Sequence, residues 1–265
     1  MGDLKEEIKA LMARVRREGE LPSSAAVVDE TFAKLGYAVG KVTPAEVLNQ
    51  FNRMLRHVWE ESLHVLEAHE ERSYAEGIPR ELAKQYPGGM SEAEEVAREN
   101  GFRAGVFHLL QRWYPVLRRC FLSVSQSRKQ RGGKDFELQV QQLLNLAAVP
   151  YHAQERRNRT DLVLPDVETY QRNRNVAAVV SLKRTLRERW AEVAEELFKL
   201  RSPNVFLFTA DEDVTAAHVR QICGEYNIHL VVWDELKARA FAREPLVLGY
   251  TEWATSRLAV LRQYW

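Results

Sequence analysis

Cysteine, long apolar runs and excess charge of either sign are all scarce in this sequence of 265 residues. The two cysteines, Cys120 and Cys223, stand in unlike surroundings and no Cys/His spacing suits zinc, so we expect two reduced, buried thiols. No apolar stretch approaches the ~20 residues that cross a membrane. The N-terminal segment also lacks the apolar core of a signal peptide. These absences favour a cytoplasmic protein without a membrane partner.

The net charge of only +1 is an argument against a DNA-binding protein. The distribution of charge is a better sign, because residues 118–189 hold fifteen Lys and Arg against seven Asp and Glu. A basic central segment, flanked by segments that are acidic overall, would concentrate the attraction for phosphate in that stretch. The plainer interpretation is that the arginines at 156, 157 and 159 only solvate a loop.

The first 122 residues have helical periodicity and no catalytic cluster. The sequence Thr43-Pro44-Ala45-Glu46 has the N-cap threonine, first-turn proline and third-position glutamate of a helix start. Pro115 should kink or divide the helix that contains it. We expect a helical N-terminal domain over residues 1–122, used for dimerisation or DNA contact, with helices over residues 3–19, 25–35, 44–68, 91–100 and 103–121.

The character of the chain changes at residues 123–134, which are rich in Ser, Arg and Lys and contain paired glycines. This segment favours a hinge, a DNA-facing loop or a plain linker. After it we expect helices over residues 135–146, 187–200 and 214–226, and strands over 149–154, 160–164, 176–182, 204–209 and 228–233. Residues 166–175 should form a polar loop, and 234–265 a terminal helix and tail. This order predicts an α/β domain over residues 123–265, with a mixed central sheet flanked by helices.

Three charged residues near neighbouring strand ends form a candidate catalytic constellation. Asp161 stands at the head of one apolar strand, Lys183 ends the next, and Glu196 lies on the helix that follows. Carboxylate oxygens suit Mg²⁺, which takes one or two protein carboxylates and keeps several waters. Such a metal activates water and polarises a phosphate, and a lysine beside it can position that water. Each residue alone would be interpreted as a surface charge, and only their joint spacing indicates a catalytic site.

A short charged triplet, Arg187-Glu188-Arg189, follows the lysine. Arginine is bidentate to guanine, and glutamate accepts a hydrogen bond from cytosine N4. The triplet could therefore read C·G pairs beside the scissile bond. Arg189 and Glu196 are two helical turns apart and should share a face, whereas Glu195 lies about 100° round the helix.

These residues resemble the motifs of the PD-(D/E)XK restriction endonucleases, specifically the EcoRII/PspGI branch that recognises CC:GG-containing sites. In that branch the second acid is displaced onto the following helix, and a small residue, here Ser181, stands two positions before the lysine. The displaced glutamate lies thirteen positions beyond the lysine and the triplet begins four positions after it, as they do here. The segment 131–137 is similar to the family's Arg-x-Gly-x-x-x-Glu motif. The resemblance covers about residues 125–233, and the chain's length and helical N-terminal portion also suit a relative that reads a CCGG core.

The resemblance implies a restriction-endonuclease-like core and a Mg²⁺-dependent, site-specific deoxyribonuclease of a bacterium or archaeon. Asp161 and Glu196 would hold the metal, Lys183 would orient the attacking water, and Glu137 would assist. Arg187, Glu188 and Arg189 would read the CC:GG pairs, with CCGG plus flanking bases favoured over CCNGG or CCWGG. The partners would be double-stranded DNA and a second copy of the chain, since a palindromic site calls for a two-fold dimer. We also name Arg131, Lys134 and Arg184 as candidate contacts to the DNA backbone.

Two other functions stay open at this point. One is a DNA-binding protein without catalysis on a nuclease-like core, which would have no need of an intact acidic pair and lysine. The other is a structure-specific repair nuclease, which would have no need of the Arg-Glu-Arg triplet.

Overall fold

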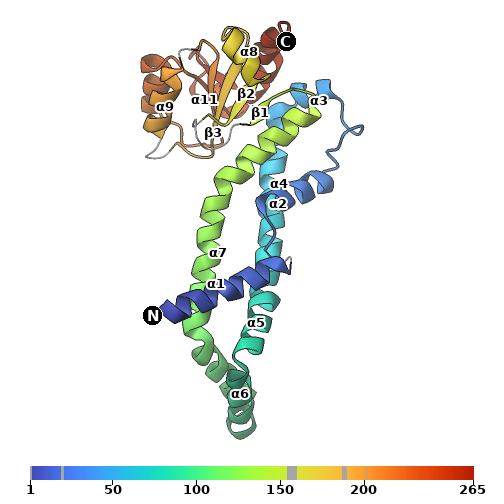
Figure 1. Ribbon diagram of the computed structural model, residues 1–265, viewed down its shortest axis with the longest axis vertical. Coiled ribbons are helices and arrows are strands. Elements are labelled where there is room, and N and C mark those ends of the chain that lie inside the picture. The colour runs from blue at the N-terminus through green and yellow to red at the C-terminus, as the bar shows by residue number, and fades with distance from the viewer. Residues whose placement is uncertain (1, 19–20, 154–159, 187–189, 201) are drawn as a thin grey trace. The chain divides into compact units, whose positions relative to one another are not determined.

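The computed structural model describes residues 2–18, 21–153, 160–186, 190–200 and 202–265. By its internal contacts the chain forms two compact units. Unit 1 comprises Met1–Val27 and Ser62–Arg131, and unit 2 comprises Val28–Glu61 and Gly132–Trp265. Two long helices, α4 (Phe51–Arg72) and α7 (Phe102–Leu146), contribute residues to both units (Figure 1). The functional boundary that we place between residues 122 and 123 stays a prediction.

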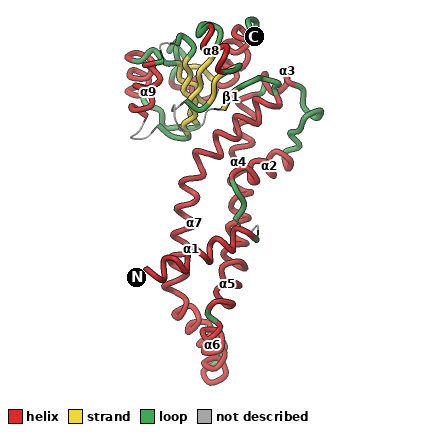
Figure 2. The backbone as a smooth tube through the Cα atoms, viewed as in Figure 1, coloured by secondary structure: helices red, strands yellow, loops and turns green. Residues whose placement is uncertain are grey.

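Unit 2 is built on a six-stranded mixed sheet (Figure 2). The first three strands pair antiparallel, and the third to the sixth pair parallel. In spatial order, which is also chain order, the strands are β1 (His152–Ala153), β2 (Leu162–Leu164), β3 (Ala178–Lys183), β4 (Val205–Thr209), β5 (His229–Val232) and β6 (Val247–Gly249). The predicted mixed sheet is confirmed.

Strand β6 is a difference from the prediction, which gives residues 234–265 only a terminal helix and tail. Its three residues are too few to show the alternation by which a strand is recognised.

Helices flank the sheet in this unit: α3 (Pro44–Asn49), α8 (Val167–Arg172), α9 (Trp190–Lys199), α10 (Ala216–Val219), α11 (Asp234–Ala240), α12 (Tyr250–Glu252) and α13 (Leu258–Arg262), with π-helical segments η2 (Arg220–Glu225) and η3 (Trp253–Arg257).

Aromatic rings pack against the parallel strands. Trp253 is buried, with its ring centroid 4.7 Å from that of Phe208 on β4. Tyr250 donates its hydroxyl hydrogen to the Thr209 carbonyl at 3.0 Å, so its one polar atom is satisfied inside the core. Trp265 is half-buried and donates from Nε1 to the Val176 carbonyl at 2.7 Å. The end of the chain is thereby fixed to the start of the segment that leads into β3.

Two predicted segments of unit 2 differ from the structure. The helix predicted over residues 44–68 begins with the expected capping box at Thr43, but it divides into α3 and α4 at Gln50, whose φ of −117° and ψ of 22° leave the helical region. The polar loop predicted over residues 166–175 contains α8. Asp166 caps this helix, accepting from the Thr169 N–H at 2.7 Å, and an aspartate in that position is a helix-start signal that the prediction overlooked.

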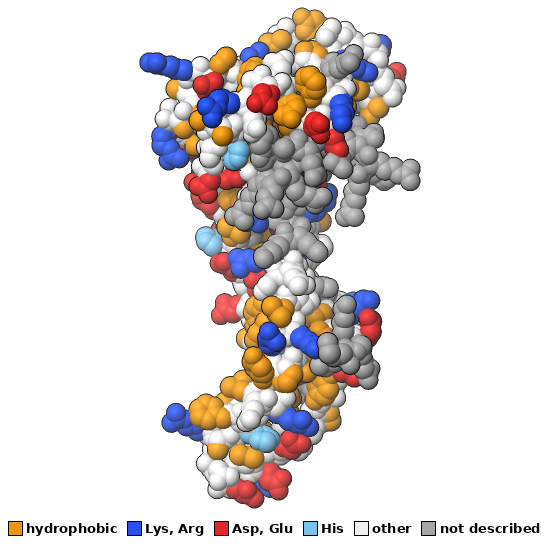
Figure 3. Space-filling model, turned by 90° about the vertical axis from the view of Figure 1, so that its left-hand side faces the viewer, with side chains coloured by type: hydrophobic (Ala, Val, Ile, Leu, Met, Phe, Trp, Pro, Cys, Tyr) orange, Lys and Arg blue, Asp and Glu red, His pale blue; other side chains and the backbone are white. Residues whose placement is uncertain are grey.

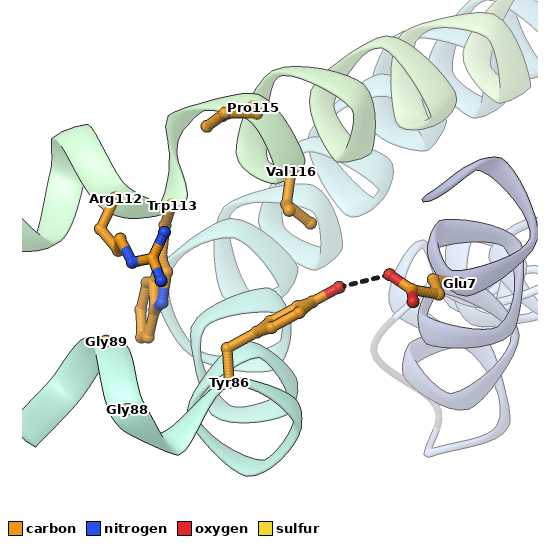
Figure 4. Close-up of a pocket in the computed structure, with 8 residues that line it drawn as sticks. All are labelled: Glu7, Tyr86, Gly88, Gly89, Arg112, Trp113, Pro115 and Val116. Carbon is orange, nitrogen blue, oxygen red and sulfur yellow. Dashed lines mark hydrogen bonds between the residues drawn. The ribbon is translucent and has the colours of Figure 1, made fainter. Parts of the chain in front are cut away.

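Unit 1 is helical throughout the elements that the structure describes. It contains α1 (Gly2–Arg17), η1 (Ser73–Gly77), α5 (Ile78–Gln85), α6 (Pro87–Asn100) and parts of α2 (Ser24–Lys34), α4 and α7. Leu11 and Met12 of α1 share a buried apolar cluster with Ile78 and Leu82 of α5. A cavity of about 410 Å³ lies between α1, α6 and α7, and inside it the Tyr86 hydroxyl donates to Glu7 at 2.9 Å (Figure 4).

Helix α7 corrects two further predictions. It is continuous through Pro115, so the division predicted there is wrong, and the kink stays a prediction. It is also continuous through residues 123–134, where a hinge, loop or linker is predicted. A proline inside a helix costs about 3 kcal/mol, because it removes one intrahelical hydrogen bond and its ring clashes with the preceding turn. Gly132 and Gly133 are helical, so their N–H groups are not presented in a loop for phosphate to approach. A few unfavourable residues are outweighed in this helix by the apolar side chains that both units bury along it.

Candidate active site

The pairing of β2 with β3 brings Asp161 and Lys183 together. Asp161 precedes Leu162, whose partner in the antiparallel register is Val180. The Asp161 N–H donates to the Val180 carbonyl at 3.1 Å and extends this pairing by one residue. Asp161 therefore lies opposite Ser181, two residues from the end of β3. The sequence spacing suggests that Asp161 and Lys183 lie close together, and the register of β2 on β3 explains why they do.

One oxygen of Asp161 accepts three hydrogen bonds. Its Oδ2 receives the Ser181 hydroxyl at 3.0 Å, the Leu182 N–H at 2.5 Å and the Lys183 ammonium at 3.2 Å. The side chains of Asp161 and Lys183 retain 19% and 29% of their exposure, so the pair is held in place but still open to a ligand. Lys183 also donates to the Leu182 carbonyl at 3.2 Å, which further fixes its head group.

Glu196 lies on α9 and is half-buried, with a buried Oε2 atom. Its neighbour Glu195 is exposed. This difference agrees with the prediction that two adjacent residues, about 100° apart round a helix, face different surroundings. Of the two, Glu196 is the one turned toward the protein.

Glu137 and Lys134 form an ion pair along α7 at 3.0 Å. Their side chains keep 26% and 54% of their exposure, and an exposed pair three residues apart on a helix is a weak restraint. Both predicted site residues are therefore still available to a ligand. Arg131 lies on the same helix in unit 1, where it and Arg128 oppose the burial that raises the pKa of Glu70.

Arg184, which directly follows the catalytic lysine candidate, is held between α4 and α7. Its guanidinium lies over the Trp59 ring, 5.0 Å from the centroid. On the other side it lies against Gly132, where a Cβ atom would overlap the guanidinium. Trp59 is itself packed edge-on against Phe136 at 6.1 Å. Neither Trp59 nor the role of Gly132 as a close-approach site is evident from the sequence.

Arg187, Glu188 and Arg189 lie outside the residues that the structure describes. The residue before them, Leu186, is buried, and its N–H donates to Oδ2 of Asp211 at 2.7 Å. Asp211 follows β4, which pairs parallel with β3 and places Thr209 beside Lys183. Our sequence reasoning missed Asp211. An available signal was its position, because the carboxyl ends of parallel strands meet at one edge of a sheet, where ligands commonly bind.

The first part of α4 covers the carboxyl ends of β4 and β5. Asn52 accepts from the Asp234 N–H at 2.9 Å and donates to Glu235 at 3.1 Å. Arg56 bonds Glu212 at 2.9 Å and Glu235 at 3.2 Å, and lies 4.4 Å from the centroid of the Trp233 ring. Residues 51–61 thus pack as part of unit 2, although the sequence places them in the helical N-terminal domain.

The residues present fit the divalent metal that the constellation implies. The described residues include no group of three or more His, Cys, Asp or Glu side chains placed to hold an ion. Mg²⁺ requires fewer, since it is usually bound through one or two carboxylates and retains water. The three hydrogen bonds that described residues donate to the Asp161 carboxylate all go to Oδ2, so Oδ1 is not part of that network. The carboxylates of Asp161 and Glu196 have the donor chemistry that such a cation prefers.

The segment that contains these residues is similar to known proteins. Residues 116–246 match the family described as EcoRII C terminal. The type II restriction enzyme SsoII of Shigella sonnei is 30% identical over an alignment of 154 residues, which covers 54% of this chain and 50% of SsoII. The matched region thus spans about half the length of this relative.

Two solved structures resemble the chain over most of its length. Metal-depleted Ecl18kI in complex with uncleaved DNA aligns with a TM-score of 0.79 at 24% identity, covering 99% of this chain and 85% of Ecl18kI. The PspGI–substrate DNA complex aligns with a TM-score of 0.60 at 17% identity, covering 92% and 93%. The restriction-endonuclease-like fold with a helical N-terminal region is thereby confirmed. No helix among the described residues is long and apolar enough to span a membrane. In fold, and in the sequence of residues 116–246, the chain is similar to type II restriction endonucleases of the EcoRII group.

Proposed function

We propose that this chain is a type II restriction endonuclease that hydrolyses double-stranded DNA at a short palindromic site with a CC:GG core. The observation that carries the proposal is the contact of Lys183 with Asp161 at the junction of β2 and β3. It lies within the segment that matches the EcoRII C-terminal family. The relatives Ecl18kI and PspGI have been seen bound to DNA, which supports DNA as the partner. The proposed substrate places the activity in the cytoplasm of a bacterium or archaeon.

Asp161 and Glu196 are the residues that would hold Mg²⁺. The bound ion would polarise the scissile phosphate and lower the pKa of a coordinated water. The Lys183 ammonium would orient the attacking water and offset the negative charge that develops on the phosphate. Asp161 Oδ2 holds that ammonium in place through their contact at 3.2 Å. Glu137, half-buried on α7, is given an assisting role through a second metal or a water.

Specificity is assigned to Arg187, Glu188 and Arg189. The anchored Leu186 N–H fixes the backbone immediately before the triplet. Arg184, Lys134 and Arg131 are candidates for phosphate contacts, which position the protein without reading sequence. A palindromic target requires a homodimer with one active site for each strand. We assign dimerisation or DNA contact to residues 1–122 and catalysis to residues 123–265.

Digestion of a sequenced plasmid with Mg²⁺ at moderate salt, followed by run-off sequencing of the cut ends, tests this proposal. We expect discrete cuts at CCGG sites with defined flanking bases, or at CCNGG or CCWGG sites. Selective retardation of the same DNA without cleavage would favour a non-catalytic DNA-binding protein. Cuts at junctions or lesions without a common sequence would favour a repair nuclease.

A further inference from the structure

Helix α7 exposes a row of large apolar side chains in unit 1. Phe107, Leu110 and Tyr114 keep 57%, 53% and 61% of their exposure. Their spacing of three and four residues places them on one face of the helix. Phe121 continues the same face at 43% exposure, and its ring also packs edge-on against Tyr74 at 4.9 Å. Leu117 lies between Tyr114 and Phe121 and packs on the core of the unit. We call Phe107, Leu110, Tyr114 and Phe121 the α7 stripe.

The spacing of the α7 stripe is typical of a seam that receives another helix. Positions that alternate by three and four residues form the contact line of a coiled coil. Hydrophobic side chains gather with basic ones over the surface of this helical part of the chain (Figure 3). A contiguous apolar patch of this kind on a protein surface marks an interaction site more often than it marks chance exposure.

Charge on this part of α7 is of one sign. Between Phe102 and Arg131 the helix carries seven Lys and Arg and no Asp or Glu. Arg112 pairs with Glu92 at 3.3 Å, and Arg128 pairs with Glu67 at 3.0 Å. Arg118 and Arg119, in contrast, form no ion pair within the described part of the chain. The helix thus presents unneutralised positive charge beside the stripe.

Helix α6 carries the opposite charge. Glu94, Glu95 and Glu99 are exposed and, among the residues with described positions, make no ion pair. One copy of the chain therefore presents an apolar stripe flanked by arginines and, on the adjoining helix, a set of free glutamates. Such a surface is self-complementary, because in a two-fold arrangement the glutamates of each copy can pair with the arginines of the other.

We infer that the α7 stripe and α6 form the interface between two copies of this chain. The glutamates of α6 in each copy face the arginines of α7 in the other, and the stripe is buried between them. Three aromatic rings and a leucine from each copy would bury on the order of 1,000 Å², which is the range of a specific interface. DNA phosphates could pair with the arginines, but DNA would not bury the apolar side chains of the stripe, and the α6 glutamates would repel its phosphates. The inference rests on the proposed function in one respect: cleavage at a palindromic site requires two copies of the chain.

Sedimentation velocity of the full-length protein without DNA tests this interface. We expect a dimer for the wild-type chain and a roughly hundredfold weaker dimer for the variant Phe107→Glu/Leu110→Glu, because central apolar side chains dominate interface energies. Both positions are exposed and glutamate favours helices, so the fold should be retained, as circular dichroism would verify. Val260→Glu is the matched control, since Val260 is 55% exposed on α13. It should leave the dimer unchanged.

Charge reversal provides a second measurement. Arg118→Glu/Arg119→Glu should weaken the dimer, and adding Glu94→Arg/Glu95→Arg should restore it. A monomeric wild-type chain, or a Phe107→Glu/Leu110→Glu variant that stays dimeric and instead loses DNA affinity, would overturn the inference. The measurement contains neither DNA nor Mg²⁺, so a chain that dimerises through this face but fails to cut DNA would defeat the proposed function alone.

Discussion

Lys183 Nζ lies 3.2 Å from Oδ2 of Asp161, and the Ser181 hydroxyl lies 3.0 Å from the same oxygen. The two donors stand on one strand and share one acceptor, yet only the lysine carries a charge. They therefore provide a matched pair for separating catalysis from the support of Asp161.

Lys183→Ala should lower the cleavage rate by at least ~10²–10³-fold, the usual cost of removing one preorganised electrostatic group. Ser181→Ala should keep cleavage within about tenfold of wild type, because it removes one neutral hydrogen bond worth ~0.5–1.5 kcal/mol and leaves the other two donors in place. Single-turnover cleavage of a mapped site measures both variants, with band-shift assays to confirm that Lys183→Ala retains most DNA binding. If the two variants lost cleavage rate equally, or if Lys183→Ala stayed active, the role that we assign to Lys183 would be wrong.

Glu196→Gln and Glu195→Gln change the charge equally at adjacent positions of α9. The first removes a half-buried carboxylate and the second an exposed one. We expect Glu196→Gln to abolish cleavage or to need a much higher Mg²⁺ concentration, because a carboxylate is a far better ligand than an amide for a hard cation. A titration of cleavage rate against Mg²⁺ concentration measures the effect. If Glu195→Gln shifted the curve and Glu196→Gln did not, the assignment of the second metal ligand would be wrong.

The parts of the fold that follow from local sequence are those with strong apolar runs. The strands β3 and β4 are almost uncharged and fully buried apart from Lys183, and both were predictable from that pattern. The proximity of Asp161 and Lys183 follows from the same pattern, because two neighbouring strands whose ends carry charge bring those charges together. Boundaries were less predictable, as the split of the helix at Gln50 illustrates.

Contacts between distant segments could not be predicted from the sequence. Asn52 and Arg56 bind Glu235, more than 170 residues later, and neither has a local pattern that indicates its partner. Arg184 looks like a solvated loop arginine until Trp59 and Gly132 are seen beside it. Local rules also overstate the effect of single residues, since Pro115 and the paired glycines do not interrupt α7.

Gly132→Ala and Gly133→Ala make the same chemical change but should have different consequences. Alanine favours a helix over glycine by ~0.5–1 kcal/mol, so Gly133→Ala, with open space around its Cβ, should stabilise the protein. At Gly132 the new methyl group must displace the Arg184 guanidinium from Trp59.

If Arg184 contacts a phosphate, Gly132→Ala should weaken DNA binding and reduce the slope of log K against log salt by ~0.9, the value for one lost phosphate contact. Fluorescence anisotropy at several salt concentrations measures that slope, and thermal unfolding measures the stability of both variants. An unchanged slope in Gly132→Ala would show that Arg184 does not bind the DNA backbone from this position.

Arg187→Ala should relax sequence preference at the base pair that it reads. The loss of one bidentate contact to guanine costs ~1–3 kcal/mol of discrimination. Cleavage rates on a set of sites with single base changes measure the preference, with Lys134→Ala as a comparison expected to weaken binding evenly across all sites. An Arg187→Ala enzyme with the wild-type order of site preference would exclude this arginine from base recognition.

Asp211→Ala should reduce discrimination between sites while leaving binding to non-specific DNA almost unchanged. Asp211 accepts the Leu186 N–H at 2.7 Å and so holds the backbone just before the triplet to which we assign base recognition. Its removal leaves that buried N–H without an acceptor, at a cost of ~1–3 kcal/mol, and removes the anchor of the backbone that precedes residues 187–189. Asp213→Ala is the matched control, because Asp213 is exposed and bonds Asp211 through its backbone N–H, at 3.0 Å, rather than through its side chain. We expect the ratio of kcat/KM for the cognate site to that for a singly substituted site to fall about tenfold in Asp211→Ala, as for a change of ~1.4 kcal/mol, and to stay constant in Asp213→Ala. A variant that lost stability but kept this ratio would limit Asp211 to a structural role.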